Sequence, residues 1–243
     1  MKKSRKKKIV ITIIVILVVF AGIVGYTVIS DLKQEEKLSN ELSEIVDLTS
    51  ANLSDMDIDK INEKLDNIIT TGDYATVEKA FKSYMKDGFN SLLQIVDVLE
   101  DEKITTLLTV ENYSKDGKEF TDSKKYISDM IKKLETYKED YHKYMNKEKA
   151  MSYIENKGLD SYYTDLYEKE YIGDINSLDL SELDDSIDEL ISILKMEEEV
   201  LNLLSDDPNS WTIQGKNIVF SDNNTLNKYN NLVKTIETKV TKI

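Results

Sequence analysis

Apolar residues recur at alternating spacings of three and four along most of the chain, which is the pattern of helices that bury one face. Short polar stretches containing Gly, Asn or Pro separate these segments. Sustained repeats joined by short loops are typical of antiparallel helix packing, so we expect an all-α protein built as a helical bundle. The pattern predicts helices over residues 31–53, 58–71, 74–99, 121–155, 162–171, 180–206 and 223–243.

One stretch departs from the helical repeat. Two triplets rich in β-forming residues, 211–213 and 218–220, flank a polar turn that contains Gly215. This arrangement predicts a small β-hairpin over 211–220, just before the last helix. An isolated hairpin is marginally stable in water, so we expect Trp211 to anchor it on the bundle. The hairpin then serves either as a hydrophobic plug between helices or as a binding loop.

The N-terminal region contains a run of 21 residues without a charge, from Ile9 to Ile29. About 20 apolar residues are needed to cross a hydrocarbon core of about 30 Å, so the run predicts a transmembrane helix. Six of the first eight residues are Lys or Arg. Positive charges before a first span hold the N-terminus in the cytoplasm. The alternative is a cleaved signal peptide, for which Val28 and Ser30 offer a weak cleavage site.

This reading divides the chain into a short inner part and a long outer part. We expect a basic cytoplasmic tail over 1–8, a transmembrane helix over 9–29, a helical stalk over 30–53 and an extracytoplasmic bundle over 54–243. The segment 101–118 is a candidate hinge between two halves of the bundle.

Composition narrows the compartment and the classes of function. The chain has no Cys and one His, which excludes disulfides, thiol catalysis and metal sites that require these residues. Beyond the six N-terminal cations, 26 Lys face 46 Asp and Glu, giving a net charge of −20 that repels nucleic acid. The bias toward Lys, Asn, Ile, Asp and Tyr is typical of AT-rich bacteria. We therefore expect no nucleic-acid partner and a Gram-positive cell membrane.

The search for chemical motifs gives no catalytic residue, no cofactor site and no metal site. The best match is an EF-hand-like series that begins at Asp55, Asp57 and Asp59. It fails at its sixth position, where Lys60 replaces the required Gly, and at its twelfth, where Asp66 replaces Glu. Acidic residues here suit the start of a helix instead.

Tyrosine is the one enriched residue type, with 14 in the chain and eight between Tyr137 and Tyr171. The tyrosines of the segment 162–171 are too many for one face of a short helix, so we expect some rings to be exposed. Exposed tyrosine is favoured in recognition surfaces. Filling space between helices is the alternative role. The candidate partner surface comprises Tyr162, Tyr163, Tyr167, Trp211 and Phe220.

Three classes of function follow. The first is a non-enzymatic interaction or accessory protein, anchored in the bilayer by residues 9–29 and binding another envelope protein. The second is a ligand-binding sensor or co-receptor subunit, because the layout resembles the outer domain of bacterial chemoreceptors. The chain differs from these receptors in having no second span before Ile243. The third is a cell-wall enzyme without a recognisable motif.

Overall fold

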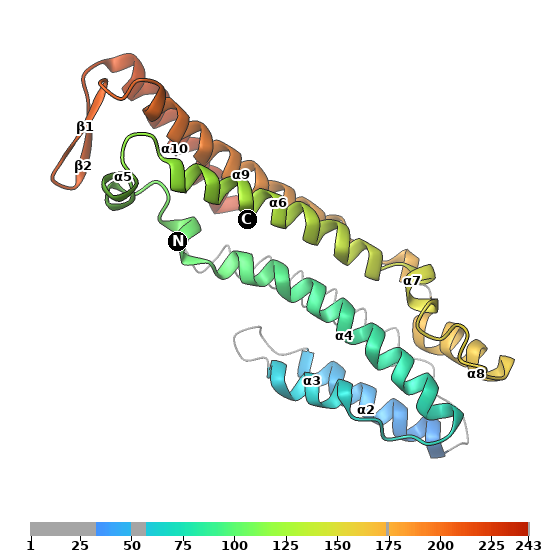
Figure 1. The fold of residues 1–243 in the computed structure, drawn as a ribbon. Coiled ribbons are helices and arrows are strands. Elements are labelled where there is room, and N and C mark those ends of the chain that lie inside the picture. The colour runs from blue at the N-terminus through green and yellow to red at the C-terminus, as the bar shows by residue number, and fades with distance from the viewer. Residues whose placement is uncertain (1–32, 50–56, 174, 243) are drawn as a thin grey trace. The chain divides into compact units, whose positions relative to one another are not determined.

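The computed structural model describes residues 33–49, 57–173 and 175–242, and these are mostly helical with one two-stranded antiparallel hairpin before the last helix (Figure 1). This confirms the helical fold class and the position of the hairpin. The elements are α2 (Lys33–Thr49), α3 (Ile58–Asp66), α4 (Asp73–Glu100), η2 (Glu102–Thr105), α5 (Val110–Asp116), α6 (Thr121–Tyr144), α7 (Lys147–Met151), α8 (Ser161–Leu166), η3 (Tyr167–Ile172), η4 (Ile175–Ser177), α9 (Ser181–Asp206), β1 (Trp211–Gln214), β2 (Asn217–Phe220) and α10 (Asn223–Lys242).

The predicted basic tail and transmembrane helix, residues 1–8 and 9–29, lie outside the described residues. Within the described ranges, every helix is too short or too polar to cross a membrane.

The described residues form two compact units. Unit one contains residues 95–136 and 183–242, and unit two contains residues 33–49, 57–94 and 137–182 without 174. The helices α4, α6 and α9 each contribute residues to both units. The segment 101–118, predicted as a hinge, lies inside unit one and forms η2 and α5.

Unit two is organised around the first three turns of α4. Val77, Phe81 and Tyr84 of this helix are buried. Helix α2 covers much of the predicted stalk, and its stripe of Leu38, Leu42 and Ile45 is also buried. The contacts of α2 with α3 show that this stripe is used for packing within the unit.

Unit one is built from antiparallel helices that bury their apolar stripes. Early in α6, Lys124 donates a hydrogen bond to Ser205 late in α9 at 2.6 Å. Late in α10, Lys239 pairs with Glu189 early in α9 at 2.9 Å. Helix α9 carries the largest stripe, which includes Leu183, Ile187, Leu190, Ile193, Leu194, Val200, Leu201 and Leu204.

Two helix boundaries differ from the sequence prediction. The helix expected to reach Gly72 ends at Asp66, because the backbone N–H groups of Ile69 and Thr70 donate to the distant Glu78 carboxylate instead. The long helix expected from Thr121 to residue 155 stops at Tyr144. Asn146 then caps a new helix, α7, since its side chain accepts from the backbone N–H of Glu148 at 2.8 Å.

The start of α6 is also capped from elsewhere in the chain. The Asp116 carboxylate accepts hydrogen bonds from the backbone N–H groups of Asp122 and Ser123, at 3.1 and 2.8 Å. Burial alone would raise the pKa of Asp116, but its hydrogen bonds with Ser123 outweigh burial and lower that pKa.

Candidate functional site

The tyrosine-rich segment of unit two is a continuous helix whose second half widens into a π-helical turn. Asp160 caps α8 by accepting from the backbone N–H of Tyr162 at 3.0 Å, and η3 continues directly from Leu166. The turn ends at Gly173, which has a φ of 54°. Single π turns are frequent at functional sites, so this segment is a candidate for one.

The π turn directs its tyrosines into the core of unit two. Tyr167 is fully buried, its hydroxyl donates to the carbonyl oxygen of Ala150 at 2.8 Å, and burial raises its pKa. Tyr171 is buried beside Phe81, with ring centroids 5.4 Å apart. These rings fill space between α4 and η3, so Tyr167 does not offer a surface to a partner in this fold.

The first turn of α8 presents tyrosines to solvent. Tyr162 is 48% exposed, and its ring centroid lies 5.2 Å from that of Tyr163 in an edge-on arrangement. Tyr163 is half-buried against the Tyr74 ring at 5.2 Å. The hydroxyls of Tyr74 and Tyr162 are 3.4 Å apart. We call Tyr74, Tyr162 and Tyr163 the tyrosine cluster.

The hairpin of unit one is fixed at its base by aromatic contacts. Trp211 is buried, stacks on Phe120 with centroids 5.8 Å apart, and donates from Nε1 to the Leu204 carbonyl oxygen at 2.7 Å. The opposite strand contributes Phe220, which is half-buried against the Tyr229 ring at 5.1 Å. Trp211 therefore anchors the hairpin and does not offer its ring to a partner.

Beyond its basal Trp211–Phe220 pair, the hairpin carries apolar side chains that the unit does not fully cover. The register pairs Trp211 with Phe220, Thr212 with Val219 and Ile213 with Ile218. Because successive side chains alternate between faces, Val219 lies on the face opposite Phe220 and is 37% exposed. Ile213 and Ile218 are half-buried. Ile213 and Ile218 share the face of Trp211 and Phe220, whereas Val219 lies on the other face. We call Ile213, Ile218 and Val219 the hairpin tip. The predicted partner surface did not include them, because alternation along a strand does not show which face the rest of the unit covers.

The five residues predicted as a partner surface thus occupy different environments. Tyr167 and Trp211 belong to the cores of their units, Tyr163 and Phe220 are half-buried, and Tyr162 is exposed. The structure places the three tyrosines in unit two, and Trp211 and Phe220 in unit one.

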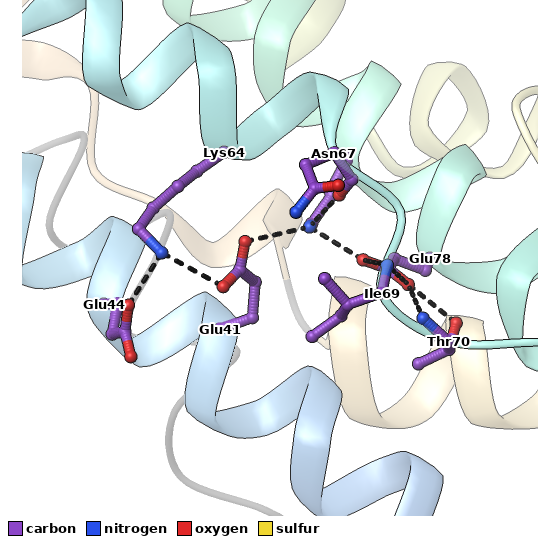
Figure 2. A network of polar contacts seen from close by, with 8 residues as sticks. Glu41, Glu44, Lys64, Asn67, Ile69, Thr70 and Glu78 are labelled. Atoms are coloured by element: carbon purple, nitrogen blue, oxygen red, sulfur yellow. Dashed lines mark hydrogen bonds and ion pairs between the residues drawn. The ribbon is translucent and has the colours of Figure 1, made fainter.

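Unit two also contains a buried ion-pair network (Figure 2). Glu78 and Lys82, one turn apart on α4, are both 0% exposed and lie 2.7 Å apart. The Glu78 carboxylate also accepts from the Thr70 backbone N–H at 2.8 Å and from the Thr70 hydroxyl at 2.6 Å. Burial alone would raise the pKa of Glu78, but the hydrogen bonds from Lys82, Thr70 and Ile69 outweigh it and lower that pKa.

The network continues from Lys82 to α2 and α3. Lys82 donates to the Asn67 carbonyl oxygen at 2.6 Å and lies 3.4 Å from Glu41 of α2. Lys64 of α3 then bridges Glu41 at 3.1 Å and Glu44 at 2.7 Å. These contacts join α2, α3 and the loop before α4. The network therefore helps to fix the position of α2 against α3 and α4 within unit two.

The described part of the EF-hand-like series lies at the start of α3, where an acidic side chain caps the helix. Asp57, part of the EF-hand-like series, caps α3 by accepting from the Lys60 backbone N–H at 2.9 Å. Asp55 lies outside the described residues. In the part of the chain that the structure describes, no group of three or more His, Asp or Glu side chains could hold a metal ion.

Comparison with known proteins gives no identification from similarity. The chain matches no protein-family model, no curated protein sequence and no solved structure.

Proposed function

We propose that the protein is a non-enzymatic interaction protein of a bacterial cell membrane, anchored by residues 9–29 with its helical units outside the cell. The observation that carries the proposal is the run of 21 uncharged residues behind six positive charges. An acidic helical body follows directly. In this arrangement the bilayer is one partner, and the described units are available to another envelope protein.

The hairpin tip is the part of unit one best suited to such a protein contact. Stacking and a hydrogen bond hold the base of the hairpin, so the tip is presented on a rigid support. Apolar groups on a rigid element lose little conformational entropy on binding. Val219, with 37% of its surface exposed, is the most accessible of them.

Topology is tested by adding protease to intact protoplasts. The proposal expects residues 31–243 to be digested and the N-terminal tail to be protected. Protection of the whole chain would show that the orientation is wrong. A mature protein that begins near Asp31 would show that the segment is cleaved and the protein secreted.

Interaction is tested by placing a photo-crosslinking amino acid at Val219 in cells and identifying captured proteins by mass spectrometry. Thr136 is the matched control, because it is exposed on α6 of the same unit but 15 residues, or about 22 Å along that helix, beyond Thr121, the neighbour of the Phe120 that stacks on Trp211. We expect one envelope protein to be captured from position 219, and Val219→Asp to abolish its co-purification while Thr136→Asp does not. Equal capture from the two positions, or none, would refute the proposed contact.

A further inference from the structure

The tyrosine cluster lies at the end of unit two where the chain enters it. Gln34, in the first turn of α2, donates from Nε2 to the Thr71 hydroxyl at 2.7 Å. Thr71 lies three residues before Tyr74, which contacts both tyrosines of α8. The start of α2, the start of α4 and the start of α8 therefore share one end of this unit (Figure 1).

Chain length restricts how far this end can be from the membrane. Ile29 is the last residue of the predicted span, and Gln34 is five residues later. An extended chain spans at most about 3.6 Å per residue, so Gln34 lies within about 18 Å of Ile29. The polar headgroup layer adds only about 5–8 Å to each side of the hydrocarbon core. An anchored chain consequently holds this end of unit two beside the outer leaflet.

We propose that the tyrosine cluster inserts Tyr162 into the headgroup region of the same bilayer and so orients unit two on the membrane. This inference rests on the proposed membrane anchoring. Tyrosine suits this location because its ring is apolar and its hydroxyl remains hydrated. Among the described residues, Tyr162 is the most exposed of the large apolar side chains. Its ring packs edge-on against Tyr163, and its hydroxyl lies 3.4 Å from that of Tyr74.

The charges around the cluster define the lipid that fits. Asp73 begins α4, and Asp160 caps α8 directly beside Tyr162; both are exposed. Carboxylates at this position repel anionic headgroups. Lys33, which begins α2 at the same end, is exposed too, so the charges of this end are mixed. The contact is therefore made by the rings, with a zwitterionic surface.

The proposal is tested by site-specific fluorescence labelling. The sequence has no Cys, so one introduced thiol is the only labelling site. Ser161→Cys places a fluorophore beside the cluster and keeps every tyrosine. Asn90→Cys is the matched control, exposed on α4 but 16 residues beyond Tyr74, or about 24 Å along the helix. Each full-length chain is reconstituted in phosphatidylcholine vesicles that contain a lipid with a headgroup quencher.

We expect quenching at position 161 to be severalfold stronger than at position 90. Equal quenching in chains that float with the vesicles would overturn the inference and leave the anchor intact. Chains that fail to float, or that carbonate extracts, would overturn the anchor together with the inference. The fluorophore at position 161 could also escape the headgroup quencher in pure lipid vesicles and yet be shielded from water in native membranes. That result would show that a protein covers the cluster, and it would overturn the inference.

A second variant tests whether the ring makes the contact. Tyr162→Asp is added to the Ser161→Cys chain. Moving a carboxylate from water into the headgroup region costs free energy, so this change should weaken the contact with the membrane. We expect quenching at position 161 to fall toward the value at position 90, with an unchanged circular dichroism spectrum. Quenching that stays at its original level would show that the tether alone brings this end to the membrane, and would overturn the role of Tyr162.

Discussion

The buried pair of Glu78 and Lys82 gives the sharpest prediction about stability. Glu78→Gln removes the negative charge, keeps the size of the side chain and leaves Lys82 buried without its nearest counter-charge. Removing one partner of a buried ion pair costs about 3–5 kcal/mol of the free energy of unfolding. We expect about 3 kcal/mol here, at the lower end, because Glu41 stays 3.4 Å from the Lys82 ammonium.

Removing both charges should restore most of this loss. In Glu78→Gln/Lys82→Met neither position of the pair is charged, Glu41 keeps its ion pair with Lys64, and the Gln amide oxygen can still accept from the backbone N–H of Thr70. Replacing a whole buried pair is often close to neutral. The free energies of unfolding of the single and double variants are compared by urea denaturation of the full-length chain in a mild detergent, followed by circular dichroism.

A matched surface pair separates the effect of burial from that of pairing. Asp129 and Lys125 of α6 are also one turn apart with the same 2.7 Å separation, but both are largely exposed. Asp129→Asn should leave stability unchanged, because water screens an exposed pair. The reasoning would be refuted if Glu78→Gln cost no more than Asp129→Asn, or if the double variant were as unstable as the single one.

The same pair predicts a pH dependence with a definite sign. The pKa of Glu78 is lower in the folded protein than its ordinary value of 4.5. Its contribution is therefore complete above the unfolded pKa and is lost as the pH falls through the folded pKa. The wild-type chain should lose more stability than Glu78→Gln/Lys82→Met when the pH is lowered below about 4.5. Parallel pH profiles for the two chains would contradict the shift.

Three further predictions concern the cores of the two units. Leu134→Asp in α6 should lower the free energy of unfolding by about 3–5 kcal/mol, because it buries an unpaired charge at a fully buried position; urea denaturation would contradict this if the midpoint were unchanged. Tyr167→Phe should cost about 1 kcal/mol through the lost hydrogen bond to Ala150, whereas the exposed Tyr162→Phe should leave thermal stability unchanged. Trp211→Ala should lower the free energy of unfolding by about 3–5 kcal/mol, and because it removes the sole tryptophan its stability is followed by circular dichroism; an unchanged denaturation midpoint would contradict the anchoring role.

The sequence by itself determined the local elements of this protein. Repeats of three and four gave the long helices, because a helix must bury one stripe of side chains to be stable, whereas the short η2 and α5 lie in the segment that was predicted as a hinge. Pro208 marked the end of α9, and the two β-rich triplets around Gly215 gave a hairpin at the observed position, although its register came only from the structure. These features depend on residues close together in the chain, and local spacing therefore reports them.

Only the tertiary structure decided which side chains remain exposed and where some helices stop. Tyr162 and Tyr167 have the same local chemistry, yet one is exposed and the other is buried beneath α4. Helix α3 ends at Asp66 because Glu78 captures backbone donors from the following loop. Periodicity identifies an apolar face but not the element that covers it, because burial and capping here depend on contacts between distant parts of the chain.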